Sequence, residues 1–177
     1  LTVSMICNIT LIGAVFYTGS LPDFTSDSSI ETISEGNFKG EIDTVRKNTV
    51  TVYNTGEVQN SQGSAFLLKN GYLVTNAHVV SGSNSVYVQF AQEQVVEGEV
   101  VGVDRYTDLA VIQPANVPGN IDGLSFANSA TVGEPVFAVG APSGFESTAT
   151  TGIISGTERS VQSLVPQYSI PDMIQVD

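Results

Sequence analysis

The sequence predicts an all-β protein whose strands form one or two compact units. Its 177 residues can bury one sizeable core or fill two small barrels, since domains usually run to about 100–200 residues. Glycine is abundant, with 17 residues, tryptophan is absent, and Val, Thr and Ile recur in short runs. This composition is typical of a fold with many strands and turns.

The N-terminal segment, residues 1–20, is largely apolar and carries no charge. Such a stretch fits a truncated signal anchor or transmembrane segment, or the core of a signal peptide. A buried helix of a soluble domain is the alternative, but the segment lacks an amphipathic stripe. We therefore expect residues 1–20 to export or anchor the chain. The rest would then lie outside the cytoplasm, either membrane-anchored or, if the segment is cleaved, secreted.

Residues 21–40 are rich in Ser, Asp, Glu and Gly and offer few apolar side chains for burial. Acidic residues recur along the stretch at Asp23, Asp27, Glu31 and Glu35. A segment of this composition is predicted to be an acidic, flexible linker. The folded part should begin after it, with a short helix over 41–47 that leads into a strand over 49–54.

Strand-like runs then follow at short intervals through residues 41–120. In VYVQF, Val86, Val88 and Phe90 share one face, which is the pattern of a half-buried antiparallel strand. Lys69-Asn70-Gly71 supplies a tight turn between two of the runs. The spacing favours a closed barrel or sandwich over βαβ units. The further runs are GSAFLL (63–68), YLVTN (72–76), VEGEVVGV (96–103) and LAVIQ (109–113).

A second strand series occupies residues 121–177 and follows the Pro- and Gly-bearing stretch PANVPGNIDG. We interpret this stretch as the connection between two β units. The runs of the second series are LSFA (124–127), PVFAVG (135–140), TTGIIS (150–155) and MIQVD (173–177).

The charge and the rare residue types exclude several classes of function. Eighteen acidic residues against six basic ones give a formal net charge of −12, so the chain is not expected to bind nucleic acid, which requires clustered Lys and Arg. Such acidity indicates a solvated, self-repelling surface or an adaptation to high salt. Cys7 is the only cysteine, which excludes an intrachain disulfide. No metal-ligand cluster or phosphate loop is visible, and no metal or cofactor is expected.

Two residues at strand ends are candidates for catalysis. His78, the only histidine, stands in YLVTNAHVV where a strand runs into a turn, and Asp108 precedes the apolar run LAVI. Alone, each is more often structural. Together they offer the imidazole and the buried carboxylate that a serine nucleophile needs. Their order, His before Asp, fits the chymotrypsin order His, Asp, Ser.

The surrounding motifs make the resemblance specific. GSAFLLKNGYLVTNAHVV resembles the HtrA/Deg pattern around the catalytic histidine, and TDLAVI resembles that family's catalytic-aspartate segment. VGEPVFAVGAPSGF, TTGIISGTER and MIQVD resemble, in turn, the opening strand of the second barrel, the strand before the activation loop and the strand before the nucleophile. The chain thus resembles an HtrA/Deg-type trypsin-like serine protease over roughly residues 41–177.

The resemblance implies a chymotrypsin-like double β-barrel, with the first barrel complete over 41–120 and the second incomplete over 121–177. It implies that His78 is the general base and then the general acid, and that Asp108 orients His78. It implies no catalytic role for Thr107. Residues Thr157–Pro171 would form the activation loop. Ser143 and Ser155 are expected to be turn residues, so the nucleophile is expected to lie beyond this chain, which alone would be inactive.

The implied function is endopeptidase activity towards unfolded or damaged proteins, in an exported, membrane-tethered protein. The alternative is a non-catalytic protease-like scaffold used for binding or assembly. Members of the family are commonly trimers, so the resemblance also implies a homo-oligomer.

Overall fold

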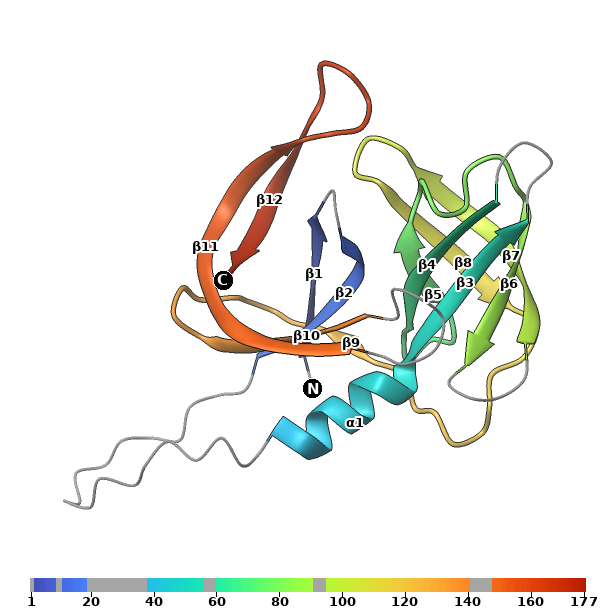
Figure 1. Cartoon of the computed structure of the whole chain (residues 1–177), viewed down its shortest axis with the longest axis horizontal. Coiled ribbons are helices and arrows are strands. Elements are labelled where there is room, and N and C mark those ends of the chain that lie inside the picture. The colour runs from blue at the N-terminus through green and yellow to red at the C-terminus, as the bar shows by residue number, and fades with distance from the viewer. Residues whose placement is uncertain (1, 9–10, 19–37, 56–59, 91–94, 141–147) are drawn as a thin grey trace.

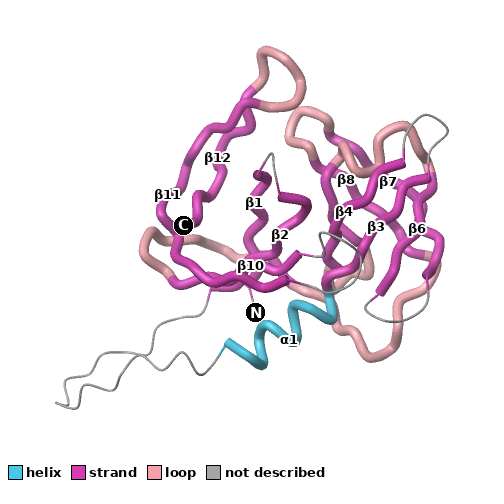
Figure 2. The backbone as a smooth tube through the Cα atoms, viewed as in Figure 1, coloured by secondary structure: helices cyan, strands magenta, loops and turns pink. Residues whose placement is uncertain are grey.

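The computed structural model of the chain consists mainly of β-strands, as the sequence predicts. It describes residues 2–8, 11–18, 38–55, 60–90, 95–140 and 148–177. In Figure 1 the strands gather into two β units beside each other, with helix α1 (Phe38–Asn48) along one side. Figure 2 shows that strands make up most of both units. The all-β fold class is confirmed.

The first unit is a closed antiparallel barrel. Helix α1 begins three residues before the expected Glu41 and runs directly into the first barrel strand, so residues 38–40 belong to a helix and not to the predicted linker. The strands close in the order β3-β4-β5-β8-β7-β6. Their bounds are β3 (Thr49–Thr55), β4 (Asn60–Leu67), β5 (Leu73–Asn76), β6 (Ser85–Phe90), β7 (Val95–Asp104) and β8 (Leu109–Pro114).

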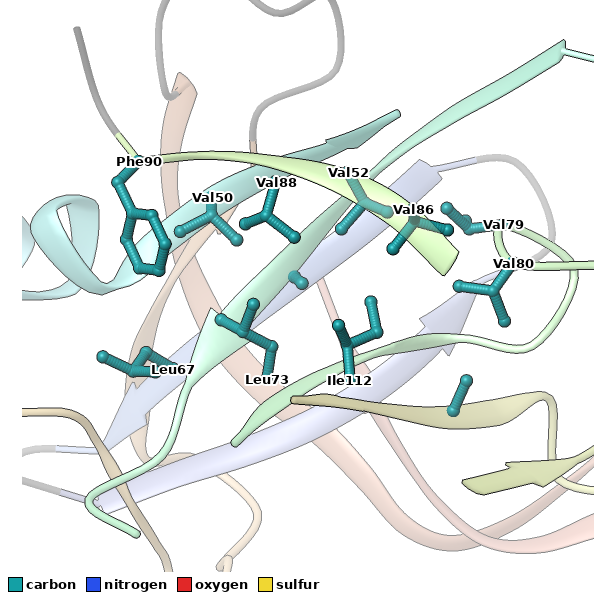
Figure 3. Packing of buried hydrophobic residues seen from close by; sticks show 12 residues of the cluster. Val50, Val52, Leu67, Leu73, Val79, Val80, Val86, Val88, Phe90 and Ile112 are labelled. Carbon is teal, nitrogen blue, oxygen red and sulfur yellow. The ribbon is translucent and has the colours of Figure 1, made fainter. Parts of the chain in front are cut away.

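The barrel interior is filled by aliphatic side chains and one aromatic ring (Figure 3). In β6, Val86, Val88 and Phe90 are buried while Tyr87 is exposed, as the period-2 pattern predicts. Full burial of such a side chain contributes about 1.5–3 kcal/mol. The core also contains Val50, Val52, Leu67, Leu73, Val79, Val80 and Ile112.

The predicted turn at 69–71 is present between β4 and β5. Gly71 has a φ of 85°, and its amide donates to the carbonyl of Leu68 at 2.9 Å. A left-handed φ of this kind is one that glycine adopts without strain. The tight turn keeps β4 and β5 antiparallel.

The second unit is a sheet with the order β12-β11-β10-β2-β1-β9. It stays open among the described residues, in agreement with the incomplete second barrel expected from the sequence. The bounds are β1 (Thr2–Asn8), β2 (Leu11–Thr18), β9 (Ser125–Phe126), β10 (Pro135–Gly140), β11 (Thr148–Gln162) and β12 (Ser169–Val176).

The N-terminal segment enters this sheet as two strands. β1 and β2 pair antiparallel, and β2 continues the sheet onto β10, with Val15 opposite Val139. No helix within the described ranges is long and apolar enough to cross a membrane. The anchoring role of residues 1–20 stays a prediction, and residues 19–37 of the predicted linker lie outside the described residues.

The chain passes from the first unit to the second between β8 and β9, and this crossing is fixed at Gly123. The amide of Gly123 donates to Asn48 Oδ1 of α1 at 2.9 Å. Next to it, the Leu124 amide donates to the carbonyl of Leu67 at 2.8 Å. Gly123 has a φ of +74°, and a Cβ there would lie 2.5 Å from the backbone of Leu68. Only glycine fits this close approach without strain.

The predicted loop Thr157–Pro171 is mostly strand, so its extent was wrong. β11 continues to Gln162 and β12 starts at Ser169, leaving 163–168 as the connection. Polar side chains do not prevent strand formation here because many residues of this hairpin are exposed, and antiparallel strands tolerate a solvated face.

Candidate active site

His78 lies in the turn that follows β5, with its side chain at the surface and its neighbours in the barrel core. The turn places Val79 and Val80 among the buried residues, at 1% and 2% exposure. The carbonyl of Val79 accepts hydrogen bonds from Asn54 Nδ2 at 3.1 Å and from Ser61 Oγ at 2.7 Å. The turn that carries the histidine is therefore held by two side-chain hydrogen bonds and by the burial of its valines.

Asp108 lies immediately before β8, as the sequence predicts. β5 and β8 pair antiparallel with Asn76 opposite Leu109, so the residues just beyond these strand ends face each other. Asp108 itself has a φ of 56°, in the left-handed region. This region is unfavourable for most residues but more accessible to Asp and Asn. Strand pairing thus brings together two residues that lie 30 positions apart.

The two side chains meet in a short hydrogen bond. His78 Nδ1 lies 2.7 Å from Asp108 Oδ2, and the backbone N–H of His78 donates to Asp108 Oδ1 at 2.9 Å. Asp108 is 4% exposed, whereas the side chain of His78 is 47% exposed. The carboxylate is buried against its partner and the imidazole reaches the surface.

The hydrogen bond to Asp108 raises the pKa of His78, with a further contribution from the negative charge of that carboxylate. Partial burial of the ring opposes this effect by penalising its charged form. With Nδ1 engaged by Asp108, the other ring nitrogen, Nε2, takes no part in this contact. The geometry is that of an imidazole oriented by a carboxylate, which is able to accept and return a proton at Nε2.

Sequence reasoning gave no role to Asn76, yet it contacts Asp108 twice. Asn76 Nδ2 donates to the carbonyl oxygen and to Oδ2 of Asp108, both at 3.2 Å. The backbone N–H of Ala77 also donates to the Asp108 carbonyl, at 3.0 Å. The T-N-x-H run contained the residue, but a sequence pattern does not reveal where an amide side chain points.

The segment before Asp108 is ordered by its own hydrogen bonds. Asp104 accepts from Thr107 Oγ1 at 2.7 Å and from the Tyr106 amide at 2.9 Å. These bonds, the one from Thr107 first, lower the pKa of Asp104. Thr107 thus stabilises the turn that carries Asp108.

The second unit reaches this same segment. Ser163 Oγ donates to the carbonyl of Tyr106 at 2.7 Å, and the Tyr106 and Tyr168 rings lie 4.5 Å apart between centroids. In Figure 1 the loop between β11 and β12 lies on the same side of the molecule as the loop between β7 and β8.

A cleft of about 860 Å³ lies next to the histidine turn. It is lined by residues 80–84 of that turn, by residues 100–106, by Ala77 and by Val165 of the second unit. Ala77, next to His78, and Tyr106, two residues before Asp108, line this cleft, whereas His78 and Asp108 themselves do not.

Ser143 and Ser155 are the two serines that were expected to be turn residues. Ser143 lies outside the described residues. Ser155 lies within β11 and not in a turn, since the strand continues through an irregular register at Gly156. Its Oγ is buried and has no hydrogen-bond partner in the part of the chain that the structure describes. The same part of the chain contains no group of three His, Cys, Asp or Glu side chains able to hold a metal.

The chain also matches a known protein family and several known proteins. Residues 63–177 match the family model of the trypsin-like peptidase domain. Protease Do-like 1, chloroplastic, from Arabidopsis thaliana is 37% identical over 124 residues, which is 68% of this chain and 28% of that protein. Serine protease Do-like HtrA from Lactococcus lactis subsp. cremoris (strain MG1363) is 43% identical over 116 residues, 61% of this chain and 28% of that protein.

A solved structure described as the HtrA-type protease AlgW with tripeptide has the same fold. It matches with a TM-score of 0.63 and 29% identity, covering 76% of this chain and 44% of that one. The chain thus spans under a third of the length of the two curated relatives and under half of the solved structure. The matched family domain includes both His78 and Asp108 and extends over most of the chain, and we conclude that this protein belongs to the trypsin-like peptidases of the HtrA type.

Proposed function

We propose that this chain contributes the general base and its orienting carboxylate to a serine endopeptidase. The observation that carries the proposal is the 2.7 Å contact between His78 Nδ1 and the buried Asp108. Asp108 holds the imidazole in the tautomer whose Nε2 is basic. Nε2 then accepts the proton of a serine hydroxyl as its oxygen attacks the peptide carbonyl, and it later gives that proton to the leaving amine.

Asp108 has a second role in this mechanism, because its charge stabilises the imidazolium that forms when His78 takes the proton. The raised pKa of His78, caused mainly by the hydrogen bond to Asp108, supports this role. The name of the Lactococcus lactis relative, which is a serine protease, supports the reaction class. The substrate class, unfolded or damaged protein, follows from the HtrA/Deg resemblance.

Hydrolysis of labelled casein tests the proposal. The protein expressed from the complete coding sequence is expected to cleave casein, and His78→Ala and Asp108→Asn are each expected to reduce the rate by several orders of magnitude. Tyr87→Phe, on the outer face of the barrel, is the control and should retain activity. Activity that survives His78→Ala would contradict the proposal.

The 177-residue chain tested beside it locates the nucleophile. We do not expect Ser143 or Ser155 to be the nucleophile, so the chain alone is expected to leave casein intact. Cleavage by the 177-residue chain that His78→Ala abolishes would place the reactive serine within it.

We further propose that residues 1–20 export or anchor the protein. The absence of charge in this segment and the acidic residues that follow it support the proposal. Cell fractionation of the chain with and without residues 1–20 tests it, and the intact form is expected in the membrane or exported fraction. Equal recovery of both forms in the cytoplasm would contradict it.

Homo-oligomer formation, as a trimer, is proposed on the HtrA resemblance. Light scattering coupled to gel filtration of the product of the complete coding sequence would measure the mass directly, and a monomer would exclude the proposal.

A further inference from the structure

The buried amide of Asn76 connects the backbone of Asp108 to its carboxylate. Asn76 ends β5 and is 5% exposed. Its Nδ2 lies 3.2 Å from both the carbonyl oxygen and Oδ2 of Asp108. A carbonyl and a carboxylate only accept hydrogen bonds, so the amide must present its nitrogen to them. The orientation of this side chain is therefore fixed by chemistry.

The backbone of Asp108 needs such support. Its φ of 56° costs on the order of 1 kcal/mol or more for a residue with a side chain. The carbonyl of Asp108 accepts from the Ala77 amide at 3.0 Å and from Asn76 Nδ2. Two donors thus hold the peptide group of a strained residue.

The carboxylate is held by donors from the same short segment. Oδ1 accepts from the His78 amide at 2.9 Å, while Oδ2 accepts from His78 Nδ1 at 2.7 Å and from Asn76 Nδ2. Rotation of the carboxylate would break the contact with Asn76 together with that to the imidazole. Because one amide group binds both ends of Asp108, it restricts the torsion between the peptide and the carboxylate.

We propose that Asn76 is a positioning residue for the reaction proposed above, because its amide locks Asp108 in the conformation that directs Oδ2 at His78. It acts through Asp108 and does not touch the reacting atoms. Loss of the amide would leave the His78–Asp108 contact in place for only part of the time.

Two other roles for Asn76 lead to different expectations. If Asn76 only fills space and satisfies buried polar groups, its loss lowers stability without changing the imidazole. If it acts only as the positive end of a dipole near Oδ2, its removal favours the charged imidazole and raises the pKa of His78. A positioning role predicts the opposite, a pKa that falls towards the ordinary value, because the hydrogen bond to Asp108 is the main cause of its elevation.

NMR titration of the His78 ring in the 177-residue chain distinguishes these roles. His78 is the only histidine of the sequence, so its ring signals cannot be confused with those of another histidine. Asn76→Leu, which removes the amide and keeps similar volume, is expected to lower the pKa of His78. A pKa that is unchanged or higher in the folded variant overturns the proposal.

Asn48→Leu is the matched control. Asn48 is equally buried, at 3% exposure, and its amide bonds the Thr44 carbonyl and the Gly123 N–H. Its loss should reduce stability and leave the His78 pKa unchanged. Asp104 and Arg105, the charged side chains of the segment before Asp108, are retained in both variants. Asn76→Ala gives the same test with less apolar bulk if Asn76→Leu does not fold.

This titration does not depend on peptide cleavage. It therefore tests the positioning role of Asn76 even if the proposed protease function is wrong. In the protein expressed from the complete coding sequence, Asn76→Leu is expected to lower kcat for casein cleavage with little change in KM, since the amide positions the base and not the substrate. A change in KM alone would contradict the positioning role.

Discussion

The protonation of His78 is linked to folding through its contact with Asp108. The folded-state pKa of His78 lies above the ordinary 6.5, mainly because of the hydrogen bond to Asp108. A group whose pKa is raised on folding stabilises the folded state fully below its unfolded pKa. That contribution is lost as the pH rises through the folded pKa, because the imidazole is then neutral in both states.

We therefore predict a pH-dependent difference between the chain and His78→Gln. The free energy of unfolding of the unsubstituted chain should exceed that of the variant most near pH 5 and progressively less towards about pH 9. Urea unfolding at a series of pH values measures both. A difference that grows with pH would have the wrong sign and would contradict the linkage.

At this scale the sequence motifs singled out His78 and Asp108, and the structure brings these two residues into contact. The sequence did not predict the residues that hold them, Asn76, Asn54 and Ser61. The hydrogen bonds of Asn54 and Ser61 go to the Val79 carbonyl, which no side-chain pattern encodes. Supporting contacts of this kind depend on three-dimensional register, which the order of residues alone does not reveal.

At the scale of the elements, the crossing from the first unit to the second depends on one glycine. Gly123 has a left-handed φ of +74°. A Cβ atom added at this residue would lie only 2.5 Å from the Leu68 backbone. Neither backbone can move freely, because the Leu67 carbonyl accepts from the Leu124 amide and the Gly123 amide is bound by Asn48.

Gly123→Ala should lower the free energy of unfolding by about 3 kcal/mol, from strain and close contact together. Gly133→Ala should cost about 1 kcal/mol, because Gly133 has a φ of +93° but open space around its Cβ position. Gly119→Ala, with neither feature, should be nearly neutral. Thermal or denaturant unfolding ranks the three variants, and equal losses at 119 and 123 would refute the argument.

Strands with a clear two-residue period were the most predictable elements. β6 and β8 lie where alternation or apolar content placed them, since one face of each had to be buried. The hairpin of β11 and β12 was underestimated, because its exposed polar residues carry no burial pattern. The strands β1 and β2 were not foreseen either, since a largely apolar segment without charge fits a helix as well as a buried strand.

The molecule as a whole carries far more negative than positive charge. Six basic residues cannot pair with eighteen acidic ones, so most of the acidic residues have no basic residue to balance their charge. The sum of their repulsions opposes the compact state, and dissolved salt screens it over about 10 Å at 0.1 M ionic strength.

The melting temperature is therefore predicted to rise with sodium chloride concentration, by several degrees between low salt and about 1 M. Calorimetry in sodium chloride measures this, and a series in sodium sulfate separates screening from the general strengthening of apolar burial. A flat or falling melting temperature in chloride would show that the surface charges lie too far apart to matter.

The left-handed backbone of Asp108 also bears on how position 108 tolerates mutation. Glycine, asparagine and aspartate are the residues that adopt this conformation most readily. The backbone conformation therefore restricts position 108 to a few residue types. Of these, only aspartate has the carboxylate that the proposed proton transfer needs. Asparagine would keep the turn and abolish the charge, whereas glutamate would keep the charge and strain the turn. Chemical similarity and structural similarity thus rank the substitutes for Asp108 in opposite orders.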